Sequence, residues 1–151
     1  MGLFLKGHEF KTKGDAETIL HLYEEYGADC VNHLRGMFAF IIWDTKTETL
    51  FAARDHFGIK PFYNGHQDEK LVCSSYLKHI TQEMGSLKEL DKESLLQYLT
   101  FQYVPCPRTM VKGVAKRPPA HRLTVKRKDV QVERYWQPTL IQKFTELIFR
   151  N

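Results

Sequence analysis

The segment that most constrains the fold is residues 36–44, whose sequence GMFAFIIWD is apolar almost throughout. Its apolar residues follow neither the stripe of an amphipathic helix nor the alternation of a strand with one wet face. A continuous apolar run of this length is typical of a β-strand that is covered on both faces. We therefore predict a strand over residues 36–44 that lies between two other layers of structure.

The rest of the chain alternates between helical and extended patterns. A helix is expected over residues 16–26, because Asp15 suits an N-cap and Gly27 suits a C-terminal stop. Further strands are expected near residues 49–54, 61–64, 70–75, 121–126 and 130–135, and further helices near residues 28–34, from 76, over 91–101 and over 139–149. A helix, then antiparallel strands, then helices makes an α+β arrangement.

Composition places the chain among globular proteins, with 42% hydrophobic and 26% charged residues in 151. No stretch approaches the ~18 apolar residues of a membrane span, and the first residues lack a signal-peptide pattern. We therefore expect a cytoplasmic protein with no membrane partner. The net charge of +4 is mild, so the cations of the C-terminal third are expected to face solvent on a hairpin and to bind no nucleic acid. These cations are Lys112, Lys116, Arg117, Arg122, Lys126, Arg127 and Lys128.

The cysteines and histidines give no motif. Cys30, Cys73 and Cys106 form neither a CxxC pair nor a disulfide framework, so we expect reduced thiols without a catalytic role. The seven histidines contain no i,i+4 pair and no HExxH sequence. Spacing therefore predicts no metal site.

Three segments carry a resemblance. They are residues 10–17, which include Gly14-Asp15-Ala16-Glu17, residues 35–44 (RGMFAFIIWD) and residues 53–63 (ARDHFGIKPFY). In this order they resemble the glutaminase domain of glutamine-hydrolysing asparagine synthetases, and residues 103–136 resemble the segment that follows. The resemblance assigns residues 1–136 to a partial glutaminase domain and residues 137–151 to the start of a linker or helix leading to a synthetase domain.

The resemblance implies a four-layer α/β/β/α sandwich of the N-terminal nucleophile hydrolase type, here expected to lack its first strands. In that family an N-terminal cysteine attacks the amide of glutamine, and the ammonia reaches a second domain that uses ATP and Mg²⁺ to activate aspartate. Asp15 matches the carboxylate that holds the α-ammonium of the substrate glutamine. Asp15 as a simple helix N-cap is the competing interpretation, and both roles can hold at once.

Other features of the family have no counterpart here. Position 2 is Gly2, the oxyanion segment Asn-Gly-Glu would precede Gly7, and the ATP motif SGGxDS would follow Trp136. We therefore expect a chain that is incomplete at both ends and inactive alone, with no catalytic residue, cofactor or metal of its own. The alternative is a non-catalytic module that pairs with a separately encoded N-terminal or synthetase piece through exposed strand edges.

Some positions depart from the family's usual residues. Gly14 stands where the family usually has serine, Ala16 where it has threonine, and Tyr76 where it has glutamate. Arg117 and Ala120 stand where it has leucine and glycine. With neighbouring strands expected to be missing, we also expect exposed apolar side chains on the central strand at Phe38, Phe40, Ile42 and Trp43.

Overall fold

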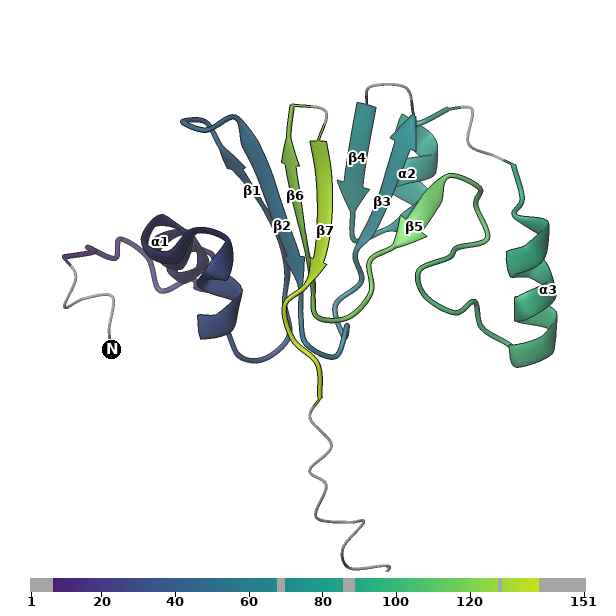
Figure 1. The fold of residues 1–151 in the computed structure, drawn as a ribbon, viewed down its shortest axis with the longest axis horizontal. Helices are drawn as coiled ribbons and strands as arrows, with labels where there is room; N and C mark the ends of the chain where they lie inside the picture. The colour runs from purple at the N-terminus through teal and green to yellow at the C-terminus, as the bar shows by residue number, and fades with distance from the viewer. Residues whose placement is uncertain (1–6, 68–69, 86–88, 128, 139–151) are drawn as a thin grey trace, which may run out of the picture.

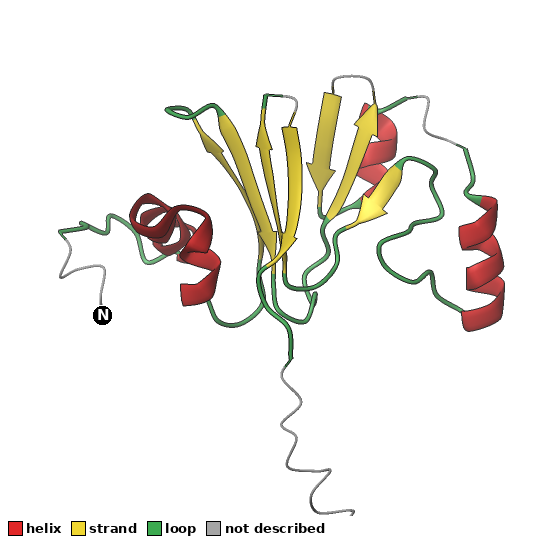
Figure 2. Cartoon of the chain, in the orientation of Figure 1, coloured by secondary structure: helices red, strands yellow, loops and turns green. Residues whose placement is uncertain are grey.

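The fold is a four-layer sandwich of one helix, two antiparallel sheets and a second helix (Figures 1 and 2). The computed structural model describes residues 7–67, 70–85, 89–127 and 129–138. The predicted α+β class and α/β/β/α layering are confirmed. The helix expected over residues 139–149 lies outside the described residues.

Two sheets form the centre of the sandwich. Sheet A has the order β1-β2-β6-β7 and consists of β1 (Ala39–Asp44), β2 (Thr49–Arg54), β6 (His121–Lys126) and β7 (Asp129–Arg134). Sheet B has the order β4-β3-β5 and consists of β3 (Tyr63–Gln67), β4 (Lys70–Ser74) and β5 (Val114–Lys116). The helical elements are α1 (Asp15–Tyr26), the 3₁₀ segment η2 (Gly27–His33), α2 (Leu77–Glu83) and α3 (Lys92–Phe101).

Helix α1 and η2 cover the outer face of sheet A. Leu22, Cys30 and Val31 are buried against Ile42 and Phe51 of the sheet. Tyr23 stacks on Phe51 with 5.2 Å between ring centroids. This layer corrects the expectation that Phe38, Phe40 and Ile42 are exposed, because Phe38 and Ile42 are buried and Phe40 is half-buried against the same cluster.

The inner face of sheet A carries two apolar rows across the four strands, which we call the inner rows. They are Ile41–Ala52–Leu123–Val132 and Trp43–Leu50–Val125–Val130. The middle of the rows is covered by Phe62, which precedes β3, and by Leu71 and Cys73 of β4, which pack in one cluster with Ala52 and Leu123. The ends of the rows stay open, with Ile41 45% and Trp43 57% exposed. The prediction that this strand is covered on both faces is therefore wrong for β1, because β1 is an edge strand and sheet B packs chiefly on β2 and β6.

Sheet B packs on α2 through a glycine. A Cβ at Gly65 would lie 2.8 Å from the Ile80 Cγ2 atom and closer still to the Met84 sulfur. The strand expected near residues 61–64 extends further than predicted, because β3 continues to Gln67. Gly65 therefore serves close packing of a strand on a helix, not a turn.

Replacing Gly65 with alanine should lower the free energy of unfolding by about 1–3 kcal/mol, because the new methyl group displaces α2 from sheet B. Urea unfolding followed by circular dichroism measures the change. The matched test is Gly65→Ala in a Met84→Ala background, where the closest clash is gone and the cost of the alanine should shrink. An equal cost in both backgrounds would contradict this account of Gly65.

Two buried charged side chains fix the loop after β2. The Asp55 carboxylate accepts the backbone N–H groups of Phe57, Ile59 and Lys60 at 3.1, 3.0 and 3.0 Å. The Arg54 guanidinium donates to the Lys60 carbonyl at 2.7 Å and to the carbonyls of Gly58 and Arg117. Both side chains therefore bind backbone groups, and together they connect the loop to the segment that leads into β6.

Candidate functional site

The first turn of α1 presents Asp15 to solvent. Gly14 is the N-cap, with extended backbone angles of φ −81° and ψ 147°, and Asp15 is the first helical residue. The interpretation of Asp15 as the N-cap is therefore wrong, since the helix begins one residue earlier than predicted. The Asp15 side chain is exposed at the helix end where the backbone dipole favours negative charge.

A second carboxylate, that of Glu17, holds this turn in place. It accepts the backbone N–H groups of Lys11 and Thr12, each at 2.7 Å, and the Thr12 hydroxyl at 2.6 Å. The Thr12 hydroxyl and the Lys11 N–H lower the pKa of Glu17 below its ordinary value. Thr12 also accepts the Gly14 N–H at 3.2 Å, so the approach to α1 is fixed without a capping side chain at position 14.

This arrangement leaves the Asp15 carboxylate available. No hydrogen bond or ion pair joins it to any other residue in the described part of the chain. An exposed carboxylate on a fixed helix turn can accept two or three hydrogen bonds from an ammonium group.

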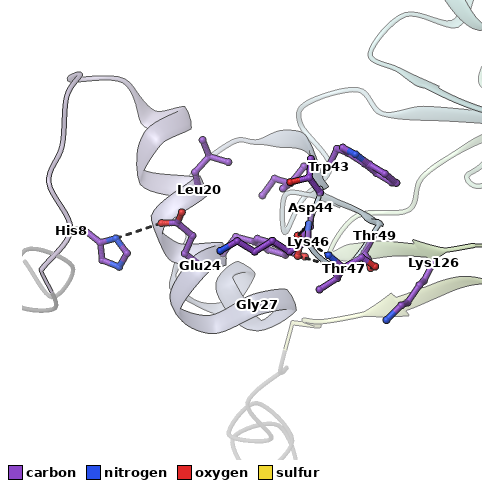
Figure 3. Close-up of a pocket in the computed structure, with 13 residues that line it drawn as sticks. His8, Leu20, Glu24, Gly27, Trp43, Asp44, Lys46, Thr47, Thr49 and Lys126 are labelled. Carbon is purple, nitrogen blue, oxygen red and sulfur yellow. Dashed lines mark hydrogen bonds and ion pairs between the residues drawn. The ribbon is translucent and has the colours of Figure 1, made fainter.

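A pocket of about 800 Å³ lies between α1 and the β1–β2 turn. Figure 3 shows His8, Leu20 and Glu24 on its helical side and the turn residues, including Asp44 and Lys46, opposite. Asp44 accepts the Thr47 hydroxyl at 2.8 Å and the Lys46 N–H at 2.8 Å, and the Thr47 hydroxyl is the main cause of its lowered pKa. Asp44 is therefore occupied in forming the turn. Asp15 does not line this pocket.

None of the three cysteines is poised as a nucleophile. Burial raises the pKa of Cys30 and of Cys73 to about 11, and Cys30 has no exposed surface. Burial also raises the pKa of Cys106, whose thiol donates to the Lys116 carbonyl at 3.2 Å. Because the thiolate is the attacking species, these environments disfavour nucleophilic chemistry. All three are free thiols, as predicted.

In the basic C-terminal third, the prediction of outward cations holds for Lys112, Lys126 and Arg127, which are exposed, but not for Arg117 and Arg122. Lys128 lies outside the described residues. Arg117 is buried, and desolvation lowers its pKa. Arg122 lies 2.9 Å from Asp29 and 2.9 Å from Glu133 and donates to the Ala28 carbonyl. Arg117 and Arg122 therefore connect layers of the fold and do not face solvent as predicted.

The structure also brings together two histidines whose spacing in the sequence indicated no common site. His8 and His21 come together with Glu24, and one donor atom from each lies within 4.8 Å of the others. Thirteen positions separate the two histidines along the chain (21 − 8). Only the path of the segment before α1, which folds back along the helix, brings them together.

Comparison with known proteins places these features in a family. The family model described as "Glutamine amidotransferase domain" matches residues 2–136. The chain belongs to the glutamine amidotransferase domain family. Asparagine synthetase [glutamine-hydrolyzing] 3 of Bacillus subtilis is 36% identical to this amidotransferase domain over 132 residues, which are 87% of this chain and 22% of that protein. Asparagine synthetase [glutamine-hydrolyzing] 2 of rice is 54% identical over 80 residues, which are 52% of this chain and 14% of that protein.

The chain thus spans about a fifth or less of the length of these relatives.

Solved structures support the fold of the amidotransferase domain. Glutamine phosphoribosylpyrophosphate amidotransferase from B. subtilis, complexed with ADP and GMP, aligns with a TM-score of 0.57 and 20% identity over 90% of this chain and 26% of its own. A structure described as the allosteric regulatory enzyme of purine biosynthesis aligns with a TM-score of 0.62 and 19% identity over 90% of this chain and 25% of its own. Among the described residues, no helix combines the length and the apolar character needed to cross a membrane.

Proposed function

We propose that this chain carries the ammonium-binding side of the glutaminase site of a cytosolic, glutamine-hydrolysing asparagine synthetase. The whole protein would hydrolyse glutamine and transfer the ammonia to aspartate in an ATP-dependent reaction. Residues 1–136 would belong to the glutaminase domain, and residues 137–151 would begin the linker to the synthetase domain. Family membership and the asparagine synthetase relatives support this proposal.

The observation that carries the proposal is the exposed Asp15 carboxylate on the first turn of α1. Glu17 and Thr12 satisfy the backbone around it, so Asp15 is not needed to close the turn. Its negative charge, the helix dipole and its open surroundings suit the α-ammonium of glutamine. Ala16, at a position where the family has threonine, adds only a methyl group beside it.

Hydrolysis itself needs an attacking thiolate, and burial raises the pKa of Cys30, Cys73 and Cys106. In the proposal a cysteine on a further polypeptide segment supplies the nucleophile, and this chain alone does not hydrolyse glutamine. ATP and Mg²⁺ would bind to the synthetase domain. The SGGxDS motif does not occur in this sequence.

Titration of the ¹⁵N-labelled chain with L-glutamine tests the role of Asp15. We expect the amide resonances of residues 15–17 to shift with a Kd on the order of 10 mM, about −2.7 kcal/mol. Asp15→Asn should weaken binding by up to about fivefold, because an exposed ion pair contributes ~0.2–1 kcal/mol.

Two controls make this test specific. Glutaramate is glutamine without its α-amino group and should leave the same resonances unmoved. Asp129→Asn changes an exposed carboxylate on β7 and should bind glutamine like the unaltered chain. Equal shifts with glutaramate, or equal binding by Asp15→Asn, would rule out Asp15 as the ammonium ligand.

The second candidate is a non-catalytic module that pairs with a separately encoded piece. The open ends of the inner rows favour it, because Ile41 and Trp43 leave apolar surface on β1, whose outer edge pairs with no strand among the described residues. The two candidates differ in one measurement. Association with a polypeptide that carries the nucleophile, without any binding of glutamine to the pair, would support the module over the glutaminase.

A further inference from the structure

The segment before α1 and the helix itself place two imidazoles around one carboxylate oxygen. Glu24 Oε2 lies 2.9 Å from His21 Nδ1 and 3.6 Å from His8 Nδ1. The two imidazole rings are 4.5 Å apart at their centroids. Figure 3 shows His8 reaching Glu24 from the extended segment beside the helix.

We propose that His8, His21 and Glu24 bind a Zn²⁺ ion through His8 Nδ1, His21 Nδ1 and Glu24 Oε2. Bonds of ~2.0–2.1 Å at tetrahedral angles put two ligand atoms ~3.3 Å apart. The distances of 2.9 and 3.6 Å lie on either side of this value. Two imidazoles and one carboxylate are ligands that Zn²⁺ accepts, and they leave a fourth position for water.

The outer nitrogens of both imidazoles already face carboxylates. His8 Nε2 lies 3.0 Å from Glu25 Oε1, and His21 Nε2 lies 3.9 Å from Glu17 Oε1. Metal-binding histidines characteristically donate the second ring N–H to a carboxylate, which fixes the ring and its tautomer. The His21 Nε2 atom is buried without a hydrogen bond. With Zn²⁺ at Nδ1, the proton of the His21 imidazole would stay on Nε2, and the Nε2–H group would point toward the Glu17 carboxylate. Three hydrogen bonds hold that carboxylate in place.

The burial of the three side chains suits a small cation. The side chains of His8 and His21 are 14% and 18% exposed, whereas that of Glu24 is 62% exposed. The imidazoles are thus held by their surroundings, and the ion has a path from solvent past Glu24. His8 and Glu24 also line the pocket of about 800 Å³, so the fourth position would be close to that pocket. A bound ion would join the segment before α1 to the middle of the helix.

Titration of the full chain with Zn²⁺ in a buffer free of chelators tests the site. We expect one ion per chain, a rise in Tm with Zn²⁺ concentration, and visible absorption of a four-coordinate complex when Co²⁺ replaces Zn²⁺. His8→Gln and His21→Gln should each weaken Zn²⁺ binding by at least ~10–100-fold, the loss seen when even outer partners of metal ligands are removed. Neither variant should abolish folding, because both imidazoles are partly exposed and neither belongs to the buried core cluster beneath α1.

The matched control is His66→Gln, which removes an exposed imidazole from β3 in sheet B. This variant should bind Zn²⁺ like the unaltered chain. Circular dichroism without metal confirms that each variant folds. No saturable binding up to about 1 mM Zn²⁺, about −4.1 kcal/mol, would overturn the proposal, as would undiminished binding by both His8→Gln and His21→Gln.

Discussion

Replacing Asp55 with alanine should lower the free energy of unfolding by about 3 kcal/mol, because three backbone N–H groups lose their acceptor. Each unpaired buried donor costs ~1–3 kcal/mol, and water can reach part of this loop because Phe57 and Ile59 are exposed. Arg54 would also lose the loop geometry that places the Gly58 and Lys60 carbonyls against it. Urea unfolding followed by circular dichroism measures the change.

The pH dependence gives a second readout of Asp55. Burial by itself raises the pKa of Asp55, but the N–H groups of Lys60, Ile59, Phe57 and Gly58 outweigh burial and hold the pKa below its ordinary value. A lowered folded-state pKa means that the stabilisation is complete above the unfolded-state value of ~3.9 and is lost as pH falls through the folded-state value. Below about pH 4, Asp55→Ala should therefore lose less stability per pH unit than the unaltered chain.

The control for Asp55 is Asp129→Ala on the exposed strand β7, which should change stability by no more than about 0.5 kcal/mol. A loss below about 1 kcal/mol in Asp55→Ala, or an unaltered acid profile, would mean that the loop does not depend on this carboxylate.

Replacing Phe51 with alanine should cost about 3–5 kcal/mol, the range for deleting a large aromatic side chain from a core. Phe51 is 1% exposed and lies at the centre of the layer between α1 and sheet A. Its ring contacts Tyr23 and Phe40, at centroid distances of 5.2 and 6.0 Å. Thermal and urea unfolding measure the loss.

A loss of this size approaches the free energy of unfolding of a typical domain, ~5–15 kcal/mol, so Phe51→Ala can unfold the chain. Phe51→Leu keeps most of the volume and should cost less, which gives a measurable value in a folded variant. The matched control is Phe57→Leu, because Phe57 is 71% exposed and its loss should change stability by no more than about 0.5 kcal/mol. Equal effects of Phe51→Leu and Phe57→Leu would show that the α1 layer contributes little to stability.

Local patterns predicted most elements of this fold. Strand β2 covers the predicted residues 49–54, and the predicted hairpin at residues 121–135 is β6 and β7. These elements carry their own signals, namely apolar runs bounded by turn residues. Strand β5 was missed because it has three residues and exists through its pairing with β3, some fifty positions away in the chain. The four layers followed from the family resemblance, not from periodicity.

The candidate sites were harder to predict, because they depend on how separate segments meet. Asp15 was found by matching a motif, but its place in the helix depends on Glu17 reaching back to Lys11 and Thr12. His8 and His21 showed no motif spacing, since one lies outside the helix that carries the other. A cation at position 117 looked like part of a solvated hairpin, but Arg117 is buried next to Asn64, to which it donates a hydrogen bond.

The order of strands in sheet A has a consequence for how the protein forms during synthesis. Strand β2 ends at Arg54 and pairs with β6, which begins at His121, so the residues that build sheet B separate two neighbours of sheet A. Pairing between such distant segments must overcome a large loss of chain entropy and slows folding. During synthesis, β1 and β2 can form only a two-stranded hairpin until β6 leaves the ribosome, and such a hairpin is at best marginally stable alone. In this period α1, or a chaperone, must shield the apolar residues of β1 and β2 from water.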